Sequence, residues 1–355
     1  PERTFEILTA HEYFGRRLWL FDYYQLLPTE HITGERLEQL LELFRRAEPG
    51  EYPYSWDFLK RYTNVDPQMF IHVAEILVDR SESQPMAGRA FDSLFNSYAG
   101  LVDELPTLFV GREDLLEKAY LLMQFDQPHS DHNGAVFDLL LNLNPRFGIT
   151  YVDWAFDQHV ESEPYPTAPD PNHNHRRYDF IWRRDDYASV MEGVVQRVYE
   201  RETSCFAYQS YVTVFLTVYG DDREDEGGRN SLLRSRQDEV LAKLIERRAG
   251  EADFVAWLFE TISHLSPDRR ARLLSTFLEN NRNVEDFNRL TLDPKEWSTS
   301  GSFVPIYQKR IEVLESFLPL VSGAARLLHR KRIEGEIDAY RNMIEAEQKR
   351  DFMGY

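Results

Sequence analysis

The sequence predicts an all-α protein, an irregular helical-repeat solenoid of the HEAT/TPR-like type that is closed by a long C-terminal helical hairpin. Three observations predict it. Apolar residues recur at helical spacing through most of the chain. The amphipathic segments come in pairs that are separated by short turns. A single helix of this kind cannot bury its own apolar face and must pack against its neighbours. An irregular helical bundle is the alternative, because no strict repeat period is present.

The first half of the chain carries four amphipathic segments. In each one the apolar residues lie three and four positions apart, which places them on one stripe of a helix. Leu37, Leu40, Leu41 and Phe44 form such a stripe in the first segment. The segments cover residues 34–47, 66–79, 112–124 and 134–143, and the second opens at Asp66-Pro67.

The second half repeats the pattern. Residues 235–248 place Val240, Leu241, Leu244 and Ile245 on one stripe, and Ser235 with Asp238 three residues on suggests a capping box. Residues 252–265 form the next segment. Ser266-Pro267-Asp268 is typical of a helix start. The third stripe consists of Leu273, Leu274, Phe277 and Leu278, and Asn280-Asn281 should end that helix.

The segment 187–219 combines two signals. Its first half has helical spacing, whereas its second half is rich in Val, Thr, Phe and Tyr, which favour strands. Because helices surround it, we expect a buried helix here.

The C-terminal part predicts a helical hairpin. A helix should start at Ser302 and continue to about residue 350, with a kink or break at Pro319. Ile333, Ile337, Tyr340 and Ile344 follow one another at spacings of four, three and four, which is heptad-like.

Two segments indicate loops. Residues 161–177 hold four prolines, and residues 221–230 are acidic and rich in glycine. The second loop predicts the domain boundary: an N-terminal helical region at 1–220, an acidic linker at 221–230, and a C-terminal helical repeat with the terminal hairpin at 231–355.

Composition limits the function. The net charge is −19, with 60 acidic and 41 basic residues, which disfavours binding to nucleic acid or to an anionic membrane surface. The single cysteine, Cys205, fits a reducing compartment, and we expect it to be an inert thiol. No membrane span or secretory signal is evident, so a cytoplasmic location is expected. The chain begins with proline, which suggests a piece of a longer protein.

Common enzyme signatures are absent from the sequence. It contains no P-loop, no G-x-G-x-x-G, no H-E-x-x-H and no G-x-S-x-G motif. We therefore expect a non-enzymatic protein without a cofactor, which works by presenting a surface to a protein partner.

Two histidine-bearing loops carry the enzymatic alternative. His129 and His132 lie near Asp126 and Asp131, and His173 and His175 follow Asp170. Imidazoles and carboxylates can bind zinc or manganese, so a metal-dependent hydrolase or nuclease is conceivable if the two loops converge. The neighbouring Pro, Asn and Gly residues favour solvated turns instead, and we expect no metal site.

Interleaved aromatic and basic residues mark the candidate partner-binding site. Tyr178, Trp182, Arg183 and Arg184 are of the types that dominate protein interfaces, although the rings equally suit a core. A basic run, residues 329–332, could contact an acidic partner, but acidic neighbours largely cancel it and favour a solvated helix face. A third alternative is an oligomerisation domain, a homo-oligomer formed through the terminal hairpin.

The C-terminal passage Trp297-Ser298-Thr299-Ser300-Gly301-Ser302-Phe303-Val304-Pro305, with the helix at Lys309-Arg310-Ile311-Glu312, resembles the C-terminal end of some large bacterial STAND-type P-loop NTPases associated with phage defence. Glu279-Asn280-Asn281 and Glu285-Asp286-Phe287 are similar too, and the resemblance covers about residues 275–345. It implies a sensor or scaffold region, C-terminal to an NTPase domain, that recognises a phage or cellular protein. No catalytic residue carries over.

Overall fold

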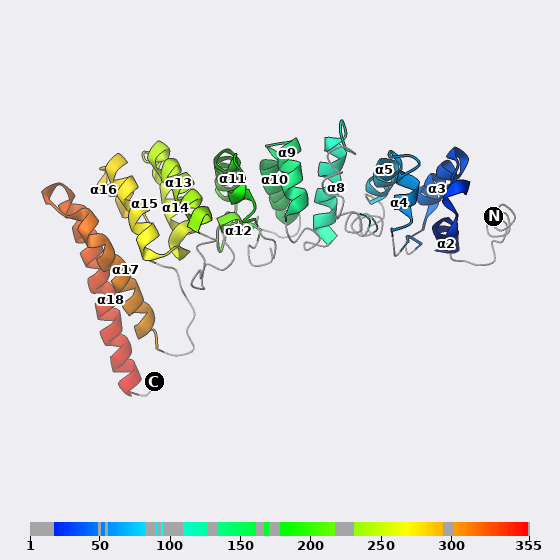
Figure 1. The fold of residues 1–355 in the computed structure, drawn as a ribbon. Helices are drawn as coiled ribbons and strands as arrows, with labels where there is room; N and C mark the ends of the chain where they lie inside the picture. Colours follow the sequence, from blue (N-terminus) through cyan, green and yellow to red (C-terminus); the bar gives the residue numbers. More distant parts are fainter. Residues whose placement is uncertain are drawn as a thin grey trace. The chain divides into compact units, whose positions relative to one another are not determined.

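The computed structural model describes residues 18–48, 51–53, 56–81, 90, 94, 109–126, 134–160, 167–169, 178–216, 231–293 and 302–353. Every regular element within these residues is a helix, and the β contact found there is an isolated parallel bridge between Thr167 and Phe206. The predicted all-α class is therefore confirmed (Figure 1).

Two compact units make up the chain. The first comprises Pro1–Ala155 with Asn172–Phe180, and the second comprises Phe156–Pro171 with Ile181–Tyr355. The predicted linker at 221–230 lies outside the described residues, and the residues on both sides of it belong to the second unit. The division of the chain at that linker stays a prediction.

The first unit is built of helices that pack on their neighbours in the sequence. In turn α2 contacts α3, α3 contacts α5, α5 contacts α4 and α8, and α8 contacts α9. Its described helices are α2 Leu18–Leu26, η1 Thr29–His31, α3 Gly34–Arg46, α4 Leu59–Thr63, α5 Met69–Ser81, α8 Glu113–Asp126, α9 Ala135–Leu143 and the greater part of α10 Phe147–Val160.

Helix α3 shows why these residues form these elements. The Thr33 side chain accepts a hydrogen bond from the backbone N–H of Arg36 at 3.4 Å, which satisfies one free donor of the first turn. The four stripe residues that the sequence predicted are buried, and Phe44 stacks on Trp56 with ring centroids 5.6 Å apart. Burial of this stripe stabilises the helix more than its intrinsic propensity does.

The second unit has the same order of packing. Helix α11 contacts α13, α13 contacts α14 and α15, α15 contacts α17, and α16 contacts α18. Its elements are η4 Ile181–Arg183, α11 Tyr187–Glu202, α12 Thr213–Leu216, α13 Ser231–Arg248, α14 Ala252–Thr261, η5 Ile262–His264, α15 Pro267–Asn280, α16 Val284–Asn288, α17 Val304–Phe317, η6 Leu318–Val321, η7 Ala324–Arg326 and α18 Leu327–Met353.

The terminal hairpin is present as predicted. Pro319 lies in η6, which separates α17 from α18, and the two long helices run side by side in opposite directions (Figure 1). Arg341 pairs with Glu315 at 3.0 Å and Arg310 donates to the Tyr340 hydroxyl at 3.1 Å. These contacts link α17 to α18.

Two local predictions were wrong. Helix α13 begins at Ser231, so Ser235 and Asp238 do not form a capping box. Asp238 instead pairs with Arg269 at 2.7 Å and with Arg272 at 2.8 Å, both on α15. The expected buried helix after residue 203 is interrupted: α11 ends at Glu202, a loop follows, and only α12 is helical among the described residues up to 216.

Candidate interaction surface

The aromatic residues of the predicted partner site are core residues in the structure. Tyr178 and Trp182 have no exposed surface. The Tyr178 hydroxyl bonds that of Tyr151 at 2.9 Å, and the Trp182 indole N–H donates to the carbonyl oxygen of Phe215 at 2.8 Å. A partner cannot reach either ring in the folded chain, so the core interpretation of the sequence replaces the interface interpretation for these two residues.

The two arginines of the predicted site lie differently. Arg183 is exposed, and the Arg184 guanidinium contacts the Asp186 carboxylate at 2.7 Å. This hydrogen bond holds the pKa of Asp186 below its usual value. Arg184 is therefore paired with the residue that precedes α11, and of the four predicted residues Arg183 is the exposed one.

The residues of the basic run at 329–332 lie on different faces of α18, so some are paired near the surface and one is buried. Arg330 and Arg332 pair with Glu334 and Glu336 one turn later, at 2.8 and 3.0 Å, which is the cancellation that the sequence indicated. His329, however, is buried. The run is therefore not one solvated basic face.

The residues of the enzymatic alternative lie outside the described residues. This holds for His129, His132, His173 and His175, and the Asp126 side chain is likewise not described. Among the side chains that the structure does describe, no group of three or more His, Cys, Asp or Glu residues is arranged to hold a metal ion.

The loop that follows α11 exposes two aromatic rings. The Phe206 side chain is 57% exposed and the Tyr208 side chain 95% exposed. Their ring centroids lie 4.8 Å apart with an interplanar angle of 85°, an edge-to-face pair. Residues 203–210 carry no charged side chain, in a chain in which 28% of residues are charged. We call this segment, residues 203–210, the aromatic loop.

The aromatic loop is held by the backbone of a second segment. The N–H of Ala168 donates to the carbonyl oxygen of Phe206 at 2.9 Å, next to the bridge with Thr167. Cys205 is half-buried, and its thiol donates to the carbonyl oxygen of Arg201 at 3.5 Å. Burial, and to a lesser degree the negative charge of Glu202, raises the pKa of this thiol, which agrees with the expected inert cysteine.

The other large apolar residues that are exposed in the described part of the chain are aliphatic or isolated from one another. Leu327 and Leu328 begin α18 and are both about half exposed, with Arg326, Arg330 and Lys331 close by in the sequence. Leu26, Val65, Val110, Leu232 and Met343 are scattered, as is usual on protein surfaces. Aromatic side chains are the ones enriched at binding hot spots, so the aromatic loop is the stronger candidate.

Sequence reasoning missed Phe206 and Tyr208 because we read their segment as helix. A usable signal was present. Residues 203–210 break the helical spacing of 187–202, and they combine two rings with a complete absence of charge.

In the part of the chain that the structure describes, no helix has the length and apolar character needed to span a bilayer. Comparison of the chain with models of known families, with curated proteins and with solved structures finds no match.

Proposed function

We propose that this chain is a protein-interaction module, the sensor or scaffold region of a larger bacterial protein, and that it contacts its protein partner through the aromatic loop. The observation that carries the proposal is the edge-to-face pair of Phe206 and Tyr208 on an uncharged segment. Burying a fully exposed large apolar side chain contributes roughly 1.5–3 kcal/mol. Tyr208 is almost fully exposed and Phe206 more than half exposed, so a partner that covers both rings would gain a large part of this free energy from each.

The order of helix packing supports the rest of the proposal. In each unit, helices contact the helices that follow them closely in the sequence, which is the arrangement expected of an irregular solenoid of helical hairpins. Such proteins act mainly by offering surfaces to other macromolecules. The resemblance of residues 275–345 to the C-terminal region of STAND-type NTPases favours a sensor of phage or cellular proteins, in the reducing cytoplasm that a single free cysteine suits.

The proposal is tested by site-specific photo-crosslinking in cells. A photoreactive phenylalanine replaces Tyr208 in one variant and Leu232 in the other, since Leu232 is also exposed in the second unit. We expect a defined crosslinked partner from position 208 and none from position 232. With the purified partner, Phe206→Ala and Tyr208→Ala should each weaken binding by about 2 kcal/mol, roughly 30-fold, whereas Leu232→Ala should leave it unchanged.

Equal crosslinking from both positions, or equal affinities of the Phe206→Ala, Tyr208→Ala and Leu232→Ala variants for the partner, would refute the aromatic loop as the binding surface.

A further inference from the structure

Glu202 is placed where a carboxylate is unfavourable for two reasons. It is the last residue of α11, where the helix dipole is negative, and its side chain is only 8% exposed. Burial raises the pKa of Glu202 above its usual value, against the opposing effect of its hydrogen bonds. A buried charge at this end of a helix persists only where specific donors compensate it.

Three donors from two other segments provide that compensation. Oε1 accepts the backbone N–H of Tyr211 at 2.6 Å. Oε2 accepts the Ser210 hydroxyl at 2.8 Å and the Trp257 indole N–H at 2.6 Å. Residues 202 and 211 enclose the aromatic loop, so one carboxylate joins both ends of the loop and ties them to α14.

We propose that Glu202 is the positioning residue of the aromatic loop, fixing it in the conformation that exposes Phe206 and Tyr208 before a partner arrives. This inference rests on the proposed function for its biological meaning, but the geometry stands without it. A binding loop that is ordered in advance loses less conformational entropy on association. The cost of burying Glu202 is thus offset within the network, and the result is a rigid pair of rings.

Alkylation of a native cysteine can be used to measure opening of the aromatic loop. Cys205 is the single cysteine and lies inside the aromatic loop, where it is half-buried. Alkylation of its thiol by iodoacetamide is slow while the loop is closed and faster once it opens. Because the Glu202 charge also raises the pKa of this thiol, the rate is measured across the thiol titration. Opening of the loop raises the plateau that the alkylation rate reaches at high pH. Loss of the Glu202 charge alone shifts only the pH midpoint of the rate profile.

Glu202→Gln is the central variant. Its amide must place an NH2 group either against the Tyr211 N–H or against the Trp257 indole N–H, and neither can accept a hydrogen bond. We expect the alkylation plateau to rise at least tenfold. Trp257→Phe removes the indole donor and keeps a ring against Tyr199 and Phe254. In the double variant Glu202→Gln/Trp257→Phe the amide can donate to the Ser210 oxygen, so the plateau should return to within about threefold of that of Trp257→Phe.

Glu260→Gln is the matched control. The negative charge of Glu260 contributes to raising the pKa of Glu202. Glu260 is exposed, however, and is not one of the three hydrogen-bond partners of the Glu202 carboxylate. Its plateau should stay within twofold of the original. Ser210→Ala removes one donor with little risk to folding, and it should raise the plateau about two- to fivefold. Urea unfolding of each variant separates loop opening from a general loss of stability.

The proposal is overturned by an unchanged plateau in folded Glu202→Gln, or by no rescue in the double variant. If Glu202→Gln fails to fold, an unchanged plateau in both Ser210→Ala and Trp257→Phe overturns it equally. Failure of the proposed function gives a different result, in which Cys205 responds as expected but position 208 crosslinks no partner.

Discussion

At the scale of single residues, His329 shows how burial overrides a sequence pattern. Its side chain is 3% exposed, neither ring nitrogen has a hydrogen-bond partner, and the Phe287 ring lies edge-on at 4.7 Å. Burial, followed by the positive charge of Arg326, lowers the pKa of His329 below its usual value. The fold therefore favours the neutral imidazole, and protonation would place a second cation beside Arg326 in an apolar site.

The lowered pKa of His329 determines how the stability of the protein depends on pH. A base whose pKa is depressed in the folded state contributes stability that is complete above its unfolded pKa, 6.5, and is lost as the pH falls below it. We expect His329→Phe to lose less stability than the original chain between pH 7 and pH 5, measured by urea unfolding. Leu328→Phe, at an exposed position one residue away, is the control and should retain the original pH dependence. Parallel pH profiles for the original chain and His329→Phe would contradict the prediction.

At the scale of elements, arginines recur as caps on the ends of helices. Within the described ranges, four arginines each donate to at least two backbone carbonyl oxygens near the end of a neighbouring helix. Free carbonyl groups at a helix end carry partial negative charge, so a guanidinium fork both satisfies and neutralises them. The four are Arg61 at the end of α2, Arg80 at the end of α3, Arg236 at the end of η4 and Arg332 at the end of α16.

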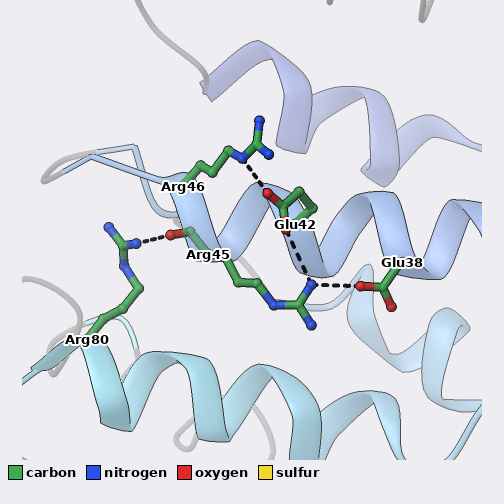
Figure 2. Close-up of polar contacts among 5 residues, drawn as sticks. All are labelled: Glu38, Glu42, Arg45, Arg46 and Arg80. Carbon is green, nitrogen blue, oxygen red and sulfur yellow. Dashed lines mark hydrogen bonds and ion pairs between the residues drawn. The ribbon is translucent and has the colours of Figure 1, made fainter.

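Arg80 provides the clearest test of this capping role. From α5 it donates to the carbonyl oxygen of Arg45 at the end of α3 (Figure 2). It also donates to the carbonyl oxygen of Ala47 and, through Nε, to the Tyr52 hydroxyl at 3.1 Å. Lysine cannot reproduce this fork. Arg80→Lys should therefore cost about 1–2 kcal/mol of unfolding free energy in urea.

The control for Arg80→Lys is visible in the same view. Arg46 pairs with Glu42 on the surface of α3 (Figure 2), and exposed pairs contribute little. Arg46→Lys should cost about 0.5 kcal/mol or less. Equal losses in the two lysine variants would show that the cap contributes nothing beyond a surface charge.

The sequence alone was enough to predict the bounds and the buried face of those helices whose apolar spacing and terminal residues agree with their packing. The stripe of α15 and its end at Asn280 are as predicted, because helical spacing and terminal residues favour the same answer. Helix α10 was missed, since its aromatic and β-branched residues give no clear polar face. Neither the arginine caps nor the contact of Glu202 with Trp257 has a sequence signature, because each joins residues that lie far apart in the chain.

At the scale of the whole molecule, the contacts within the second unit suggest stability shared between neighbours. Helices α11, α13, α15 and α17 contact one another in that order. In a solenoid, stability is approximately a sum of the contributions of each repeat and of the contacts between neighbouring repeats. A protein with a single globular core instead unfolds cooperatively, so a destabilising substitution affects the whole core. The sequence predicted stacked helices without a strict period, and the two arrangements differ in how a local defect spreads.

Hydrogen exchange after two core substitutions distinguishes these arrangements. Leu274→Ala in α15 and Met191→Ala in α11 each remove a fully buried side chain, which costs roughly 2–5 kcal/mol. In a solenoid, Leu274→Ala should lower amide protection in α15, α13 and α17 more than in α11. Met191→Ala should lower it in α11 and α13 and leave α17 nearly unchanged, because α17 packs chiefly on α15 and α18. Uniform loss of protection from α11 to α17 in both variants would instead favour a cooperative bundle, since two defects at different places cannot give the same profile through nearest-neighbour contacts alone.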